Sequence, residues 1–111
     1  MAKKAFVDYD KENDILYIST KQKISDSLDF DNFVIDFSPQ GKIVAVEIMR
    51  ASDFVKKFIR VSRTSLSKVK HASMSIIQSK EYAMIKILLA IPKIKENEPL
   101  FVPAPVPGVA K

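Results

Sequence analysis

The sequence predicts an α+β fold: an antiparallel sheet of three β-hairpins with one short amphipathic helix between the second and third hairpins. Two observations predict it. Three pairs of β-rich runs are each joined by a short polar turn, and a stripe of apolar residues with helical spacing follows the second pair. A chain of 111 residues fits one domain. We expect that domain at residues 1–92, followed by a proline-rich tail at 93–111.

The first hairpin is predicted around the polar loop DKEND. The runs AFVDY (5–9) and ILYIS (15–19) flank this loop and are rich in aromatic and β-branched residues. Asp10 is expected to accept hydrogen bonds from backbone amides of its own turn.

The same loop resembles the start of a calcium-binding loop, with Asp10, Glu12 and Asp14 at alternate positions. Ile15 stands where that loop needs a glycine, and Lys21 stands where it needs a bidentate glutamate. A metal site is therefore not expected, and no other cofactor is indicated.

The second hairpin is predicted from NFVIDF (32–37) and IVAVEIM (43–49). Between them, Pro39 suits the first corner of a β-turn, and Gly41 can adopt the positive φ that closes it. The preceding residues 20–29 are polar and carry aspartates, which indicates an exposed connector.

A short helix is predicted next, with Ser52 as its N-cap and Asp53 near the positive end of its dipole. One face is apolar and the opposite face is basic. The apolar stripe is Phe54, Val55, Phe58 and Ile59, and the basic face is Lys56, Lys57 and Arg60.

The third hairpin is predicted from residues 71–79 and 82–91, after a polar link at 62–68. The strand at 82–91 is apolar on both faces, which is typical of a strand covered on both sides. We therefore expect a homodimer through this last strand. Pro103, Pro105 and Pro107 favour an extended tail, which Leu100, Phe101 and Val102 could attach to its own domain or to another subunit.

Residues 7–53 resemble the small prokaryotic domain-of-unknown-function family 2283. The family pattern is a YD-x-x-x-D-x-LYI hairpin, then a strand, a glycine-bearing turn, and a strand that ends in a glutamate before a closing Ala-Ser. The matching residues here are Tyr9, Asp10, Asp14, Leu16, Tyr17, Ile18, Asp36, Gly41, Glu47, Ile48, Ala51 and Ser52. The resemblance implies a small α+β fold without known catalytic residues. It also implies an antitoxin-like binding module for small toxin-like proteins.

Two other candidate sites follow from the residue types. Asp14 could form an acidic pair with Asp36 or Glu47 across the sheet, and paired carboxylates can support acid–base chemistry. Nothing in the sequence supplies the nucleophile or oxyanion donors that such an enzyme needs. A basic cluster is the second candidate: Lys56, Lys57, Arg60, Arg63, Lys68 and Lys70.

The charge is divided unevenly along the chain. Residues 1–55 carry a net charge of −3, whereas residues 56–111 carry +8. Such a division can steer an acidic partner, or a second copy, onto the basic half. The leading hypothesis is thus a small cytoplasmic protein, neither exported nor embedded in a membrane, that acts by binding another protein. The alternative is a basic nucleic-acid-associated module, and an enzyme of unknown type ranks third.

Overall fold

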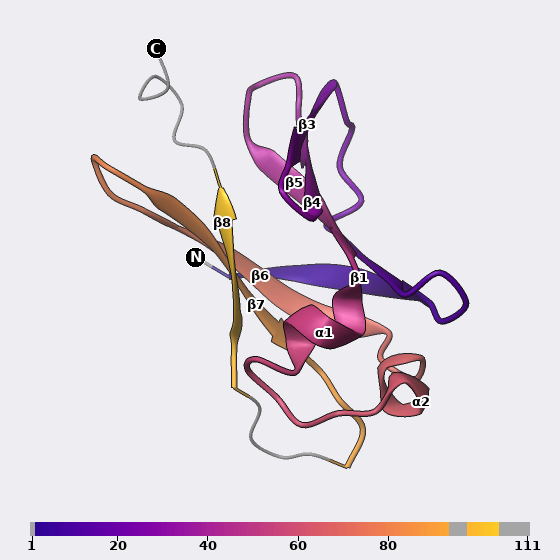
Figure 1. Ribbon diagram of the computed structural model, residues 1–111. Helices are drawn as coiled ribbons and strands as arrows, with labels where there is room; N and C mark the ends of the chain where they lie inside the picture. Colours follow the sequence, from indigo (N-terminus) through magenta and orange to yellow (C-terminus); the bar gives the residue numbers. More distant parts are fainter. Residues whose placement is uncertain (1, 94–97, 105–111) are drawn as a thin grey trace.

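The computed structural model describes residues 2–93 and 98–104, and in this part of the chain eight strands form a single antiparallel sheet (Figure 1). The spatial order is β3-β4-β5-β2-β1-β6-β7-β8. The strands are β1 Lys3–Asp10, β2 Ile15–Ser19, β3 Asp26–Phe30, β4 Phe33–Phe37, β5 Ile43–Met49, β6 His71–Gln78, β7 Ala83–Leu89 and β8 Leu100–Ala104.

The predicted α+β fold class of three hairpins and a helix is wrong, although the strands of those three hairpins are placed correctly. Hairpins β1–β2, β4–β5 and β6–β7 all form. Pairing of β2 with β5 and of β1 with β6 then joins them into one sheet, and strands β3 and β8 extend that sheet at its two ends. About half of the described residues lie in strands, so the fold is essentially all β.

Strand β3 lies where the sequence predicts an exposed connector. All five of its residues are exposed, and it pairs with β4 through the two-residue turn Asp31–Asn32. Asp31 adopts a positive φ of 59°, which aspartate tolerates better than most residues. The strand therefore depends on backbone pairing to β4, and its composition alone does not reveal it.

Strand β8 lies beyond residue 92, where the sequence predicts a proline-rich tail that Leu100, Phe101 and Val102 could attach to its own domain. Leu100 and Val102 are fully buried and pair with Ile87 and Ile85 of β7. Pro103 is exposed in this edge strand, a position where the missing N–H of proline is tolerated. The sheet thus extends to residue 104. The rest of the predicted tail at 93–111, namely residues 94–97 and 105–111, lies outside the described residues.

The helical segment is shorter than predicted and begins differently. Helix α1 covers Ala51–Val55, and its N-cap is Arg50 in a left-handed conformation, with no side-chain capping bond. Ser52 lies inside the helix, so its predicted role as N-cap is wrong. A second helix, α2 Arg63–Leu66, occupies the predicted polar link and is capped by Ser62, whose side chain accepts a hydrogen bond from the Ser65 amide. Within residues 2–93 and 98–104, no helix is long and apolar enough to cross a membrane.

Both short helices cover one face of the sheet and complete its core. Val55 of α1 and Leu66 of α2 are fully buried against the apolar side chains of the strands. The largest fully buried side chains are Leu16, Ile18, Ile35, Ile48, Leu66, Ile85, Ile87, Leu89, Leu100, Val44, Val46 and Val55. Each fully buried side chain of this kind contributes about 1.5–3 kcal/mol to folding.

Candidate functional site

The most extensive polar site in the described chain is built around Asp14, the last residue of the β1–β2 turn. Asp14 has a positive φ of 56°, and its backbone carbonyl accepts a hydrogen bond of 2.9 Å from the Ala51 amide at the start of α1. The turn is therefore fastened to the helix through the main chain as well as through side chains.

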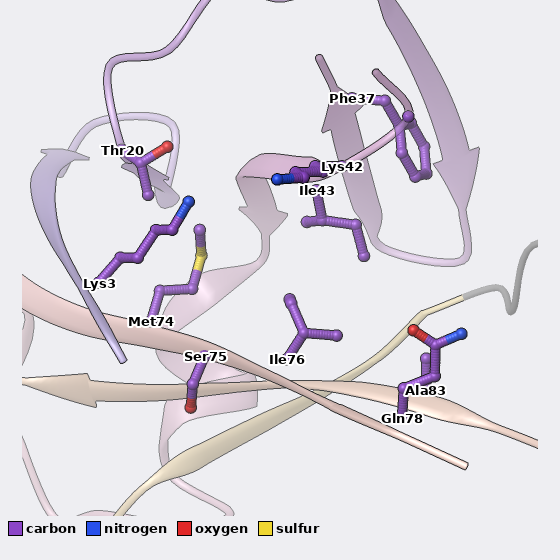
Figure 2. Close-up of a pocket in the computed structure, with 11 residues that line it drawn as sticks. Lys3, Thr20, Phe37, Lys42, Ile43, Met74, Ser75, Ile76, Gln78 and Ala83 are labelled. Atoms are coloured by element: carbon purple, nitrogen blue, oxygen red, sulfur yellow. The ribbon is translucent and has the colours of Figure 1, made fainter. Parts of the chain in front are cut away.

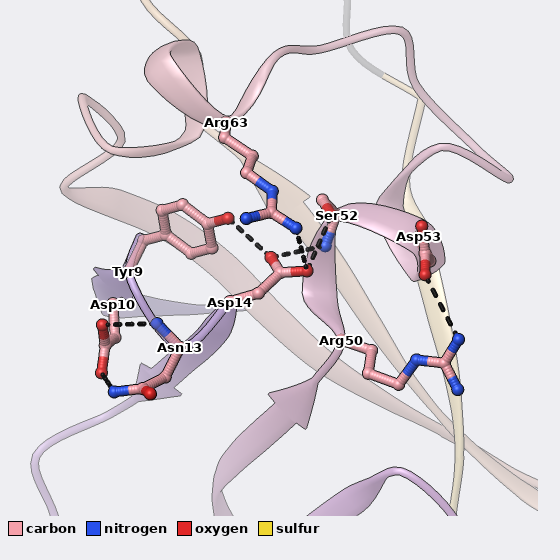
Figure 3. Close-up of polar contacts among 8 residues, drawn as sticks. All are labelled: Tyr9, Asp10, Asn13, Asp14, Arg50, Ser52, Asp53 and Arg63. Carbon is pink, nitrogen blue, oxygen red and sulfur yellow. Dashed lines mark hydrogen bonds and ion pairs between the residues drawn. The ribbon is translucent and has the colours of Figure 1, made fainter.

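The Asp14 carboxylate accepts hydrogen bonds from three elements (Figure 3). Tyr9 of β1 donates its hydroxyl to Oδ1 at 2.6 Å. Ser52 of α1 donates its amide to Oδ1 at 3.0 Å and its hydroxyl to Oδ2 at 2.7 Å. Arg63 of α2 lies 3.3 Å from Oδ2 and forms an ion pair with it. We call Tyr9, Asp14, Ala51, Ser52 and Arg63 the Asp14 junction.

The Asp14 junction supplies the cap that α1 lacks within its own sequence. The first amides of a helix have no intrahelical acceptors, and an anionic oxygen there is favourable. Arg50 offers no acceptor from its side chain, so the Asp14 carboxylate, 38 residues before Ser52, accepts the Ser52 amide instead. The Asp14 side chain is only 13% exposed, which strengthens these contacts.

The electrostatics of the junction favour an ionised Asp14 and a neutral Tyr9. Burial raises the pKa of Asp14, but the hydrogen bonds from Tyr9 and Ser52 and the charge of Arg63 outweigh it and hold that pKa below its usual range. Burial, followed by the hydrogen bond to Asp14, raises the pKa of Tyr9 to about 12. A carboxylate with these bonds already made is suited to holding structure rather than to exchanging protons.

We expect the contribution of Tyr9 to stability to disappear at high pH. Because its pKa is raised in the folded state, the contribution is present below pH 10 and is lost as the pH rises towards about 12. Urea unfolding across this range should show a steeper loss of stability for the wild type than for Tyr9→Phe. Tyr82→Phe, at a ring that is 54% exposed, serves as the control and should follow the wild type. Parallel losses for the wild type and Tyr9→Phe would contradict the assignment.

Asp10 performs the local role predicted for it. Its carboxylate accepts hydrogen bonds from the Asn13 amide at 3.0 Å and from the Asn13 side chain at 2.8 Å. These bonds lower the pKa of Asp10. Residues 2–93 and 98–104 contain no group of three or more acidic or histidine side chains that could hold a metal ion.

The acidic pair considered from the sequence does not form. The Asp36 carboxylate instead accepts a hydrogen bond of 2.6 Å from the Ser27 hydroxyl, near the far end of β4. Glu47 pairs in register with Tyr17, and both line a shallow hollow on the outer face of the sheet together with Asp8 and Asp10. Asp14 is therefore separated from both of its suggested partners.

Gly41 and the basic cluster occupy other parts of the molecule. Gly41 has the positive φ expected of it, 79°, in the β4–β5 turn. The members of the basic cluster are all exposed, and they lie along the segment between the end of α1 and the start of β6: Lys56, Lys57, Arg60, Arg63, Lys68 and Lys70. Arg63 differs from the rest because it pairs with Asp14.

The family pattern recognised in the sequence begins with Tyr9 and Asp14 and ends with Ala51 and Ser52. The structure brings these two ends of the pattern together in the Asp14 junction. Residues 7–52 match the model of the family described as protein of unknown function (DUF2283). The family resemblance is confirmed for this segment. Four of the five junction residues lie inside the DUF2283 segment, and Arg63 lies outside it. Three polar residues of the motif, Tyr9, Asp14 and Ser52, therefore meet at one structural joint.

Two relatives are similar to parts of the chain. An uncharacterised protein of Methanocaldococcus jannaschii, MJ0789, is 42% identical over 50 residues, which are 44% of this chain and 43% of that protein. The chain thus spans less than half the length of MJ0789. A protein of Methanosarcina mazei named "Putative hypoxanthine phosphoribosyltransferase" is 29% identical over 87 residues, 78% of this chain and 68% of that protein. No solved structure matches the chain significantly.

Sequence reasoning missed the junction because it treated Asp14, Ser52 and Arg63 as parts of three separate local features. A signal was available in the family pattern itself, which keeps an aspartate after the turn and an Ala-Ser after the last strand. Two polar positions at the ends of neighbouring strands can share a hydrogen bond when β2 and β5 pair in antiparallel register, as they do here.

Proposed function

We propose that this chain is a protein-binding module whose β3 edge pairs with a strand of a cationic partner protein. The observation that carries the proposal is the position of β3. It is the first strand in the spatial order and, within residues 2–93 and 98–104, pairs only with β4, so no described strand pairs with the N–H and C=O groups of its other edge. Exposed edges of this kind accept an added strand from a partner.

The side chains of β3 supply an apolar contact beside that edge. Leu28 and Phe30 pair with Ile35 and Phe33 of β4, so they share the core face of the sheet. Ile35 and Phe33 are buried, whereas Leu28 and Phe30 are 42% and 39% exposed. The apolar core therefore extends to the β3 edge but remains partly exposed to solvent there. An added strand with apolar side chains would cover Leu28 and Phe30.

The charge of β3 indicates what kind of strand fits. Asp26 and Asp29 lie within the strand and Asp31 follows it, and residues 26–31 include no lysine or arginine. Three carboxylates repel the same edge of a second copy but attract a strand that carries lysine or arginine. This chemistry agrees with the antitoxin-like role implied by the family resemblance.

A homodimer is the second candidate, supported by exposed apolar side chains on the outer face of β6 and β7. Ile77 and Leu88 are 42% and 39% exposed there. Strand β7 is paired on both edges, by β6 and by β8, so a dimer through this strand would use its face.

The nucleic-acid alternative has weaker support. The basic cluster is exposed, but one of its two guanidinium groups, that of Arg63, is already committed to Asp14. Salt-sensitive retention on DNA or RNA that is lost in Lys56→Glu/Lys57→Glu would favour this alternative. No contact of the Asp14 junction supports the activity in the name of the Methanosarcina mazei relative.

The test is co-purification from the native host with charge reversal at the edge. The tagged wild type should retain a basic protein, and Asp26→Lys/Asp29→Lys should release it. Asp53→Lys is the control for a charge reversal elsewhere, since Asp53 is an exposed acid away from β3 whose ion pair, among the described residues, is with exposed Arg50. The purified partner should then protect the amides of residues 26–30 from hydrogen exchange.

Equal retention by both charge variants, or retention of no basic protein, would overturn the proposal. Sedimentation equilibrium distinguishes this proposal from the homodimer by the measured mass, because a module that binds through its β3 edge is monomeric without its partner. A dimer that Leu88→Lys dissociates would favour self-association instead.

A further inference from the structure

A cleft opens at one end of the sheet because the central strands β1 and β2 stop there before the hairpins beside them do. Strand β1 begins at Lys3 and β2 ends at Ser19, whereas hairpins β4–β5 and β6–β7 continue past both positions. The two hairpins face each other across the resulting space, which has a volume of about 390 Å³ (Figure 2). This size is typical of sites for small organic ligands.

The walls of the cleft are largely apolar. They are formed by side chains of the two hairpins: Phe37, Ile43, Met74, Ile76 and Ala83. Ile76 is 37% exposed although it lies on the same strand face as buried Met74. This part of the apolar face therefore meets solvent inside the cleft rather than the core.

The two charged side chains that line the cleft are both cationic, and its other polar side chains are the uncharged Thr20, Ser75 and Gln78. Lys3 comes from the start of β1 and Lys42 from the β4–β5 turn, and Figure 2 shows both side chains on the same side of the cleft as Thr20. Among the residues that the structure describes, no aspartate or glutamate lines the cleft. Among the described residues, the ion pairs are Arg50–Asp53 and Arg63–Asp14, so neither Lys3 nor Lys42 is neutralised by one of these carboxylates.

We propose that this cleft binds a small amphipathic organic anion, with its carboxylate or phosphate head between Lys3 and Lys42 and its apolar body between the hairpins. Two ammonium groups without a paired acid attract an anionic head. The apolar walls favour a hydrocarbon or aromatic body, because its transfer from water covers Ile43 and Ile76. This site is at the opposite end of β1 from the Asp14 junction and is independent of the β3 edge.

The test uses decanoate as the probe and the full chain, with binding followed by methyl NMR shifts. Decanoate should shift the methyl signals of Ile43 and Ile76, with a dissociation constant of about 1 mM or tighter. Lys3→Gln/Lys42→Gln should weaken binding about tenfold. Both lysines are exposed, so this variant should remain folded. Lys56→Gln/Lys57→Gln, which removes two exposed lysines elsewhere, should bind decanoate like the wild type.

Uncharged and oppositely charged probes complete the test. Decanol should bind at least tenfold more weakly than decanoate, and decyltrimethylammonium should leave Ile43 and Ile76 unshifted. Decyl phosphate distinguishes the two head groups, and binding of either anion supports the proposal. Equal affinities for decanol and decanoate, no loss of affinity in Lys3→Gln/Lys42→Gln, or shifts confined to Ile77 and Leu88 would each overturn it.

Discussion

Replacing Asp14 with alanine is expected to lower the free energy of unfolding by about 4 kcal/mol at neutral pH. The substitution removes the acceptor of four hydrogen bonds and leaves the Ser52 amide, the Ser52 hydroxyl and the Tyr9 hydroxyl without a partner. Hydrogen bonds to a charged group contribute about 1.5–3 kcal/mol each, but bonds that share one acceptor are not additive. Urea unfolding followed by circular dichroism measures the change.

Asp31→Ala is a matched control for the backbone. Asp31 has a φ of 59°, close to the 56° of Asp14, but its side chain is exposed and lies in a hairpin turn. Alanine at either site must adopt a left-handed backbone conformation, which lowers the free energy of unfolding by about 1 kcal/mol. Asp14→Ala should therefore cost about 3 kcal/mol more than Asp31→Ala. Equal costs would show that the carboxylate contacts of Asp14 contribute nothing.

The acid sensitivity of the fold follows from the same contacts. Because the pKa of Asp14 is lowered in the folded state, its contribution is present above its usual value of 3.8 and is lost as the pH falls through the lower folded value. Asp14→Asn retains an oxygen acceptor and tolerates a positive φ, but it has no charge to titrate. The variant should be less stable than the wild type at neutral pH. The difference between their free energies of unfolding should become smaller as the pH falls.

Replacing Leu100 with alanine is expected to cost about 2–5 kcal/mol, the range typical of a buried leucine. Leu100 is fully buried and pairs with Ile87, which is also fully buried. The truncation leaves a cavity between β7 and the core, which rigid neighbouring strands fill only in part. The same urea measurement gives the cost.

Pro103→Ala is the control for the Leu100 substitution. Pro103 lies in the same strand but is exposed, so its replacement should cost about 1 kcal/mol at most, mainly through the greater freedom of the unfolded chain. A loss below about 1 kcal/mol for Leu100→Ala would mean that β8 is not anchored in the core, and would contradict this account of the strand.

The six hairpin strands could be predicted because each is encoded locally. Runs of β-branched and aromatic residues end at polar turns, and Gly41 marks one turn by a conformation that few residues adopt. Adjacent strands in the sequence then pair with each other. Their assembly into one sheet was not predictable in this way, because the pairing of β1 with β6 joins residues more than 60 positions apart.

The two edge strands could not be predicted because their sequences suit other structures equally well. DSLDF in β3 carries two aspartates, and LFVPA in β8 carries a proline, and both residue types are depleted in strands. Each strand forms because a hairpin next to it offers an unpaired edge. Tertiary context therefore overrides local preference at both ends of the sheet.

The candidate site was predictable only in its parts. Tyr9 and Asp14 were identified from the family pattern and Ser52 from its capping preference, whereas Arg63 was assigned to a basic surface. Their meeting point depends on the register between β2 and β5, which carries Asp14 to the start of α1. The predicted capping chemistry of Ser52 was wrong, because its hydroxyl donates to a distant carboxylate and does not accept a bond from a helix amide.

A double-mutant cycle between Asp14→Ala and Ser52→Ala tests most directly whether the motif is a structural joint between the first hairpin and α1. The two residues are 38 positions apart, and their side chains meet at 2.7 Å. The free energies of unfolding of the wild type, both single variants and the double variant should give a coupling energy of about 1–2 kcal/mol. Additive effects, with a coupling energy near zero, would show that these residues do not act together and would contradict the joint.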